Sequence, residues 1–302
     1  MQTRFRPDRQ LSARMGVTMF LLGLLYVAFI AVLVVLIKSV VVVVLLAVGL
    51  LAAQWWFSDR IALYGMQARV VTPEQAPRLH AIVDRLCATA DMPKPRVAVA
   101  DTDLPNAFAT GRSSKRAVLC VTTGLSRRLE TGELEGVLAH ELSHVAHRDV
   151  VVMTVASFLG VVAGLVARFA FYSTLFGDGR RDGRDGDGGQ LFLMILLVMA
   201  VSAAVYAISF LLIRALSRYR ELAADRAGAM LTGRPSALAS ALTKISGDIG
   251  RIPTRDLRSA QAFNAFFFLP LVGKGLTLAS LLATHPPLQK RLDQLATLSN
   301  QL

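Results

Sequence analysis

Residues 131–149 read TGELEGVLAHELSHVAHRD, and the organisation of the whole chain can be worked out from this stretch. Thr131 is the predicted N-cap of a helix, because its hydroxyl can accept a hydrogen bond from the free N–H groups of a first turn. Glu133 and Glu135 follow in that turn, where the positive end of the helix dipole favours carboxylates. The stretch is therefore predicted to be a helix that carries the later histidines.

The chemical signal in this helix is the pattern His-Glu-x-x-His at 140–144. Residues i and i+4 lie on one face of a helix, so His140 and His144 can both direct an imidazole at one divalent metal ion. Glu141 lies beside the first histidine, where its carboxylate can take a proton from a water molecule activated by that metal. A helix with two ordinary histidines is the alternative, and the rest of the sequence must decide between them.

A catalytic zinc site needs three protein ligands and one open position, so a third ligand must be found. His147 is near, but three ligands along one straight helix would have to reach a single point from about 10 Å of its axis. Glu221 is the better candidate. Asp225 shares its helical face and can accept the free ring N–H of a ligand histidine, which fixes the tautomer. The alternative for this acidic pair is a solvated pair that forms salt bridges with the flanking arginines.

The distances from the membrane support Glu221. The helix that carries His144 is predicted to run without a break into an apolar stretch that starts near Val150, which puts His144 about 9 Å above that point. Another apolar stretch ends near Ile213, so Glu221 stands about 12 Å above the same membrane face. If the two stretches form an antiparallel hairpin, both sets of ligands stand at similar height on neighbouring helices.

The composition is that of a membrane protein. Apolar residues make up 54% of the 302 residues and charged residues only 18%, whereas soluble domains carry about 25% charged residues. Four apolar stretches have the length that a helix needs to cross a bilayer. They cover about 15–37, 40–57, 150–172 and 191–213. The predicted organisation is a tail and hairpin over 1–57, a polar part over 58–149, a second hairpin over 150–213 and a polar part over 214–302.

The basic residues predict the orientation. They cluster before the first apolar stretch and after the second and fourth, which places both termini and both polar parts at the cytoplasmic face of the cell membrane. The Gly-rich loop 177–190 is then outside and flexible. Two cysteines, Cys87 and Cys120, are too few for a disulfide framework and suit a reducing compartment. The net charge of +12 is explained by this orientation, and no motif suggests binding to nucleic acid.

The first polar part is predicted to be a small α+β unit. A helix is expected from Thr72 to about Thr89, and its His80 is expected on the surface. Short strands are expected at 96–100, 107–110 and 117–121, from their β-branched content and the Gly and Pro residues between them. The expected class is a predominantly α membrane protein with a short β-sheet.

The sequence resembles the HtpX-type membrane zinc metalloproteases, which are related to the CAAX prenyl proteases. Four blocks carry the resemblance and cover most of the chain in the expected order. They are Asn106-Ala107-Phe108-Ala109-Thr110-Gly111, His140 to His144 with Arg148-Asp149, Ser217-Arg218 through Glu221 and Asp225, and Thr284-His285-Pro286-Pro287 with Arg291-Leu292.

The resemblance implies a gluzincin-like metalloprotease domain and a role for each matching residue. One Zn²⁺ per chain would be ligated by His140, His144 and Glu221. Glu141 would be the general base, and Asp225 would orient a ligand histidine. The remaining roles are those of His285, which would stabilise the oxyanion, and of Asn106 and Phe108, which would bind substrate beside an edge strand.

The function implied is hydrolysis of peptide bonds in unfolded or damaged membrane proteins at the cytoplasmic face, as part of protein quality control and the stress response. Three alternatives remain open: a prenyl-protein protease, a non-enzymatic membrane protein with a structural zinc site that His147 completes, and a transporter. The segment 262–282 is a core element, a membrane contact or a lid, and the oligomeric state is open.

Overall fold

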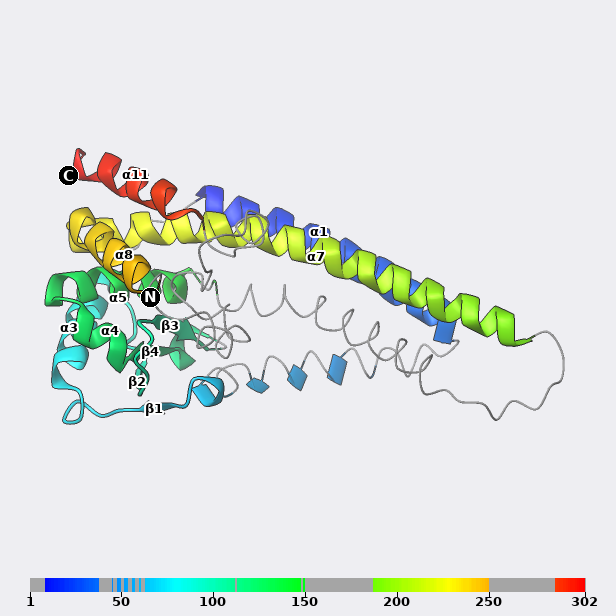
Figure 1. Cartoon of the computed structure of the whole chain (residues 1–302), viewed down its shortest axis with the longest axis horizontal. Coiled ribbons are helices and arrows are strands. Elements are labelled where there is room, and N and C mark those ends of the chain that lie inside the picture. Colours follow the sequence, from blue (N-terminus) through cyan, green and yellow to red (C-terminus); the bar gives the residue numbers. More distant parts are fainter. Residues whose placement is uncertain are drawn as a thin grey trace. The chain divides into compact units, whose positions relative to one another are not determined.

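The computed structural model describes residues 9–37, single positions between 45 and 60, and residues 63–111, 113–147, 149, 187–249 and 286–301. The described part is mostly helical, with one small mixed β-sheet (Figure 1). The chain divides into two compact units. We call them the sheet unit (Met1–Ser12, Phe57–Val151 and Ser217–Leu302) and the helical unit (Ala13–Trp56 and Val152–Leu216).

The sheet has four strands in the order β1-β2-β4-β3. They are β1 (Ala68–Val70), β2 (Arg96–Ala100), β3 (Ala107–Thr110) and β4 (Val118–Thr122). The central strands β2 and β4 are parallel, and each outer strand is antiparallel to its neighbour. Strand β3 is therefore an edge strand, and one row of its backbone N–H and C=O groups points away from the sheet.

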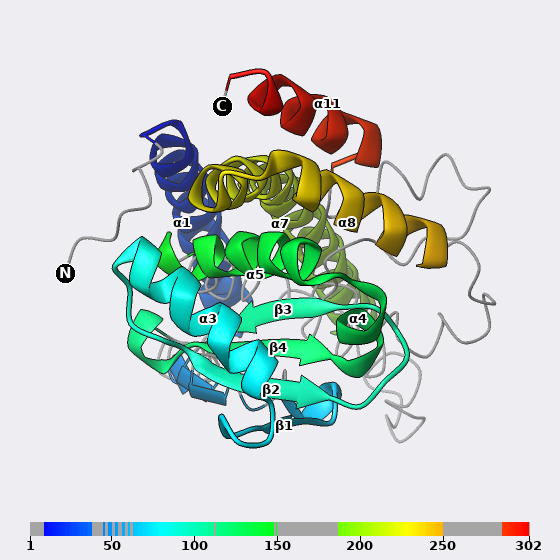
Figure 2. The same ribbon diagram turned by 90° about the vertical axis from the view of Figure 1, so that its left-hand side faces the viewer.

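Helix α5 (Thr131–Ala146) lies along β3, between the sheet and helix α8 (Figure 2). Helix α3 contacts α5, and α11 packs on α8. The other helices of this unit are α3 (Pro77–Ala90), α4 (Thr123–Arg128), the 3-10 turn η1 (Ser114–Arg116), α8 (Pro235–Ile249), α11 (Leu288–Ser299) and the part of α7 (Asp187–Thr232) from Ser217 onward.

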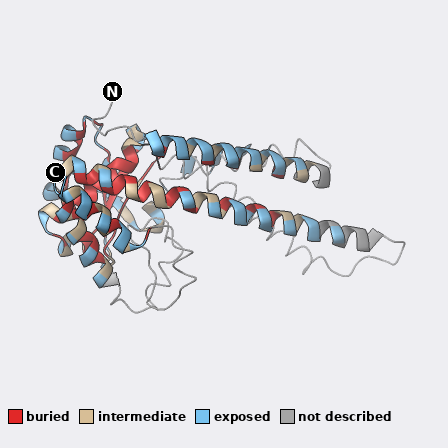
Figure 3. Ribbon diagram, turned by 90° about the horizontal axis from the view of Figure 1, so that it is seen from above, coloured by how far each residue is buried: buried red, intermediate tan, exposed pale blue. Residues whose placement is uncertain are grey.

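The main core lies between the sheet, α3, α5 and α8, where the buried side chains of the described residues concentrate (Figure 3). Leu134, Leu138 and Leu142 of α5 are fully buried in it. A second cluster covers the opposite face of the sheet and includes Phe108 and Cys120. Both cysteines are buried and free, and burial raises the pKa of the Cys87 thiol to about 11.

The helical unit contains α1 (Arg9–Ile37) from Ala13 onward and the part of α7 up to Leu216. Two candidate spans lie within these helices, Arg9–Val32 and Leu196–Thr232, and only 17% of the apolar window of each is buried. Exposed apolar side chains such as Phe20 and Leu211 are costly in water and suited to lipid. Both helices are consistent with a membrane protein. The expected spans at 150–172 and, for the most part, 40–57 lie outside the described residues.

Three sequence-based expectations in the sheet unit are corrected. Strand β1 was not predicted, because it is only three residues long and two of them are exposed. Helix α3 begins at Pro77 and not at Thr72, since Gln75 closes a turn back onto Thr72 through its side chain and its backbone N–H. His80, expected on the surface, is buried with its Nε2 3.1 Å from the carbonyl oxygen of Val71.

Two boundaries near the predicted spans also differ. Helix α5 ends at Ala146, with His147 as its C-cap, so it does not continue as the same straight helix towards 150. Helix α7 already begins at Asp187, inside the stretch expected to be a flexible loop. From there it continues as one helix through the apolar stretch to Glu221 and Asp225.

Candidate metal centre

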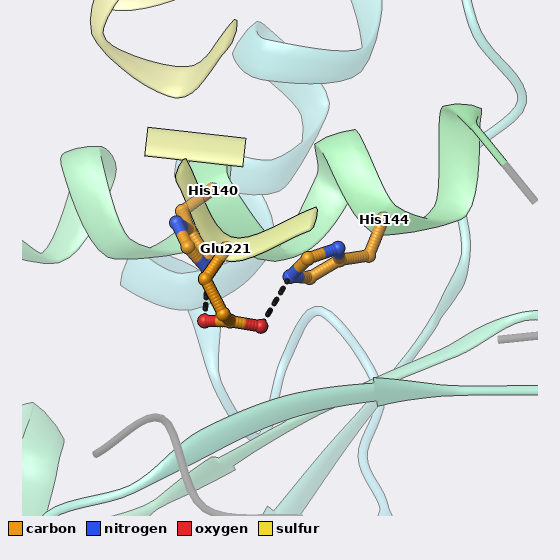
Figure 4. A group of neighbouring side chains, drawn as sticks. All are labelled: His140, His144 and Glu221. Atoms are coloured by element: carbon orange, nitrogen blue, oxygen red, sulfur yellow. Dashed lines mark ion pairs between the residues drawn. The ribbon is translucent and has the colours of Figure 1, made fainter. Parts of the chain in front are cut away.

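Three buried side chains converge between α5 and α7. Helix α5 presents His140 and His144 on one face, and α7 brings the carboxylate of Glu221 opposite them (Figure 4). One ligand atom from each residue lies within 4.8 Å of the others. The Nε2 atoms of His140 and His144 each stand 3.5 Å from a different carboxylate oxygen of Glu221.

These separations fit a bound metal better than direct hydrogen bonds. A charge-assisted N–H···O bond is about 2.7–2.9 Å long, whereas two ligand atoms on a tetrahedral zinc ion stand about 3.3 Å apart. Two imidazole nitrogens and a carboxylate oxygen are also a donor set that zinc accepts. Among the described residues this is the one group found that could hold a metal ion, and its donor set fits zinc in its chemistry.

Each histidine is oriented through its other ring nitrogen. The Nδ1–H of His140 donates to Oδ1 of Asp225 at 2.9 Å. The Nδ1–H of His144 donates to Oδ2 of Asp149 at 2.8 Å. Both carboxylates are buried. A partner at Nδ1 leaves the Nε2 lone pair of each ring directed towards the metal position.

Asp225 contacts a histidine of the group, His140, whereas Asp149 as the partner of His144 was not predicted. Asp149 was noted only as part of a motif, because on a continuous helix a residue five positions on would not face His144. The end of α5 at Ala146 removes that constraint. The signal in the sequence that could have identified this partner is an acidic residue, Asp149, shortly after the second histidine.

Two arginines back these carboxylates. Arg291 of α11 donates from Nε and Nη2 to the two oxygens of Asp225, both at 2.7 Å. Nε of Arg220 lies 3.1 Å from Oδ2 of Asp149. Burial alone would raise the pKa of both aspartates, but the neighbouring arginines and histidines outweigh it and hold each pKa below its usual value. Both carboxylates are therefore ionised at neutral pH.

Glu141 is buried beside the ligands, and its Oε2 accepts a hydrogen bond from the backbone N–H of Ala109 at 3.0 Å. This bond ties the carboxylate to the outward-facing row of β3. Burial raises the pKa of Glu141, against the lowering effect of the two histidines. A carboxylate with a raised pKa is a better proton acceptor, which suits a general base.

The imidazoles hold protons strongly without a metal. Burial would lower the pKa of His144, but the hydrogen bond to Asp149 and the nearby Glu221 carboxylate outweigh this effect and raise the pKa to about 10. The pKa of His140 is raised in the same way, by Asp225 and Glu221. A metal ion must therefore displace protons from the site, as is usual for histidine ligands.

The remaining predicted site residues lie in different places. Asn106 is fully buried directly before β3, and Thr122 Oγ1 bonds both its backbone N–H and its carbonyl oxygen. The side chain of Phe108 packs in the cluster on the opposite face of the sheet from α5. His147 donates from Nδ1 to Ser143 O and is outside the ligand group. His285 lies outside the described residues.

Comparisons with known proteins show the family of the chain. A model of the peptidase family M48 matches residues 73–299. Protease HtpX homolog 1 of Streptomyces coelicolor is 66% identical, over all of this chain and 97% of that protein. The Protease HtpX homolog of Moorella thermoacetica is 50% identical, over all of this chain and 99% of that protein.

The fold is also similar to a solved structure. The crystal structure of S. mikatae Ste24p superposes with a TM-score of 0.52 at 18% sequence identity, over 95% of this chain and 67% of that chain. The likeness is one of fold alone. The family model, the full-length relatives and the convergence of two histidines with a glutamate lead to one conclusion: the chain belongs to peptidase family M48.

Proposed function

We propose that the protein is a membrane-bound, zinc-dependent endopeptidase that binds one Zn²⁺ per chain through His140, His144 and Glu221. The observation that carries the proposal is the convergence of these three side chains within 4.8 Å, beside Glu141, in a chain of a peptidase family. The ligand group supplies three protein ligands, the number typical of a catalytic site with an open position. A structural site would usually have a fourth, and His147 is directed to a backbone carbonyl instead.

The residues divide the reaction between them. A zinc ion held by His140, His144 and Glu221 would supply Lewis-acid chemistry for a peptide carbonyl and for water. Glu141 accepts a proton from the attacking water and passes it to the leaving amine. Asp225 and Asp149 keep the imidazoles of His140 and His144 in place while charge develops. His285 is proposed as the group that stabilises the oxyanion.

The substrate is proposed to be an extended polypeptide. Strand β3 ends the sheet among the described strands, and its Ala109 N–H holds Glu141, so an extended chain bound along β3 would pass close to this carboxylate. Asn106, directly before β3, and Phe108 of β3 are proposed to contact the substrate. An open edge favours unfolded segments, because a folded protein rarely offers a free strand.

We further propose four membrane spans, at about 15–37, 40–57, 150–172 and 191–213, with the parts 58–149 and 214–302 at the cytoplasmic face. The basic residues that flank the predicted spans support this orientation. A peptidase with its site close to the membrane is suited to clearing damaged membrane proteins, which is the quality-control role that we propose.

The test compares wild-type protein with Glu141→Gln, each purified in full length in detergent. We expect wild type to hydrolyse casein and Glu141→Gln to lose at least about 100-fold in rate, the range for a missing general base. Zinc should stay near one ion per chain in both, because Glu141 is not a ligand. The matched control is Glu135→Gln on the same helix, whose carboxylate pairs with Arg85 outside the ligand group. Equal hydrolysis by wild type and Glu141→Gln, or wild type without zinc, would contradict the proposal.

A further inference from the structure

Arg291 has an unusual place for an arginine. It lies on the C-terminal helix α11, and its side chain is fully buried. Its Nε and Nη2 each donate to a different oxygen of Asp225, which is itself fully buried. Two parallel bonds from a planar guanidinium fix the plane of the carboxylate as well as its position.

Stability alone does not explain this pair. Moving two charges out of water costs much of what their attraction returns, and well-packed apolar side chains often replace a buried ion pair without loss. Helix α11 has other attachments, since Gln294 Nε2 donates to Leu222 O at 2.8 Å and Leu295 is buried in the core. The Arg291–Asp225 pair therefore calls for a further reason.

The further reason is that Asp225 also holds His140. The same oxygen, Oδ1, accepts a bond from Nη2 of Arg291 and another from Nδ1 of His140. Arg291, Asp225 and His140 thus form a continuous chain of bonds from α11 to the metal position. The carboxylate that orients His140 cannot turn away while the guanidinium grips both of its oxygens.

The second histidine is backed differently. Asp149, which orients His144, has Arg220 beside it, and Arg220 precedes Glu221 on the ligand helix α7. Asp149 follows α5 closely in sequence, and Arg220 is on α7 itself. For His140, by contrast, the arginine comes from a separate helix 66 positions beyond Asp225.

We propose that Arg291 is a positioning residue of the metal centre: by holding Asp225, helix α11 sets the orientation of His140 and the affinity of the site for zinc. The inference rests on the proposed zinc site and goes beyond it, because it makes the C-terminal helix a part of that site. Arg291 is outside the ligand group and would act on it through Asp225.

The test measures zinc affinity by competition with a chromophoric chelator, for the full-length protein in detergent. Arg291→Lys keeps the charge but cannot donate two parallel hydrogen bonds to Asp225. We expect zinc to bind about 10- to 100-fold more weakly, the usual cost of losing a group that orients a metal ligand. The matched control is Arg128→Lys, because Arg128 makes the same two-pronged contact with Asp103 in an exposed place away from the metal. It should leave zinc affinity unchanged.

A double-mutant cycle separates positioning from a merely structural role. If Arg291 acts through Asp225, then Arg291→Lys should weaken zinc binding in wild type but add little in an Asp225→Asn background. Leu295→Ala, which loosens α11 from the core, should lower the melting temperature without this coupling. If Arg291→Lys fails to fold, Arg291→Gln takes its place in the same cycle.

The outcomes are distinct. Wild-type zinc affinity in Arg291→Lys and Arg291→Gln, or additive effects with Asp225→Asn, would overturn the inference while leaving the proposed function intact. Wild-type protein that binds no zinc would contradict the proposed function first, and the inference with it.

Discussion

Gly228 allows α7 to approach α5 closely, beside the backbone of His140. A Cβ at this position would lie 2.8 Å from the backbone nitrogen of His140 and 3.1 Å from its Cα. Both atoms are backbone, so they cannot turn aside as the end of a side chain could. The close approach of the two ligand-bearing helices therefore requires glycine here.

We predict that Gly228→Ala lowers the apparent melting temperature by about 2–10 °C, which corresponds to about 1–3 kcal/mol of overpacking. It should also reduce bound zinc, because the strain falls on the backbone of a ligand. The measurement is thermal unfolding with zinc analysis. Gly132→Ala is the control, since its Cβ would stand 3.8 Å from the nearest atom, an Arg234 nitrogen. Wild-type melting and zinc content in Gly228→Ala would refute this account.

At the same scale, helical spacing is visible without a fold, and it pairs His140 with His144 and Glu221 with Asp225 in the sequence. The residues that hold these side chains in place are harder to predict. Arg291 and Arg220 act across distances in sequence that only the packed helices bring together. Phe108 shows the limit of a motif, because the motif does not state on which face of the sheet its side chain lies.

At the level of elements, the N-terminus of α5 is joined to α8 by a shared carboxylate. Glu130 is the N-cap, one residue before the predicted Thr131, and it forms a capping box with Glu133. The Glu133 carboxylate also accepts a hydrogen bond from the Ser240 hydroxyl and forms an ion pair with Lys244, and both of these residues lie on α8. Glu133 therefore caps α5 and also holds α8 against its N-terminus.

This cap should make stability depend on pH. Burial would raise the pKa of Glu133, but Lys244, Ser240 and the Glu130 N–H outweigh it and hold the pKa below the unfolded value of 4.5. The folded state thus gains stability above about pH 4.5 and loses it as the pH falls through the folded-state pKa. Glu133→Gln should lower the melting temperature at pH 7 by a few degrees, for a cap worth about 1 kcal/mol.

The measurement is the melting temperature of wild type and Glu133→Gln from pH 7 down to pH 3. The two curves should converge at the acid end, because wild type then carries a neutral side chain as well. Glu135→Gln, with its exposed partner Arg85, should differ little from wild type at any pH. A constant gap between wild type and Glu133→Gln over the whole range would contradict the pH argument.

The elements themselves show what spacing can and cannot predict. Strands β2 and β3 match the predicted 96–100 and 107–110, and β4 is shifted by one residue from 117–121. Their β-branched content and the turns between them carry that information. Strand β1 depends on pairing with β2 and has no pattern of its own. The end of α5 at Ala146 could not be predicted, because nothing in the sequence there breaks a helix.

At the scale of the whole molecule, the metal position joins parts of the chain that are distant in sequence, since 85 positions separate His140 from Asp225. A zinc ion that binds the folded state alone would stabilise it by about 2.7 kcal/mol at a free concentration 100 times its Kd. We predict that chelation lowers the apparent melting temperature by about 5–10 °C and that added zinc restores it.

The check is a thermal melt of the same sample before chelation, after chelation and after zinc is returned. Glu221→Gln, which lacks a ligand, should melt at one temperature in all three states. If the wild-type melt were insensitive to chelator, or if Glu221→Gln responded as wild type does, the metal would not be linking the parts as described.

The place of Arg291 has a consequence for biosynthesis. A ribosome delivers His140 and Glu141 early, Glu221 and Asp225 much later, and Arg291 a further 66 positions after Asp225. The helix that orients the first histidine therefore emerges only after all the ligands. A chain that has not yet made α11 would lack the helix that we propose to hold Asp225, so we expect its site to bind zinc more weakly than the site of the finished protein.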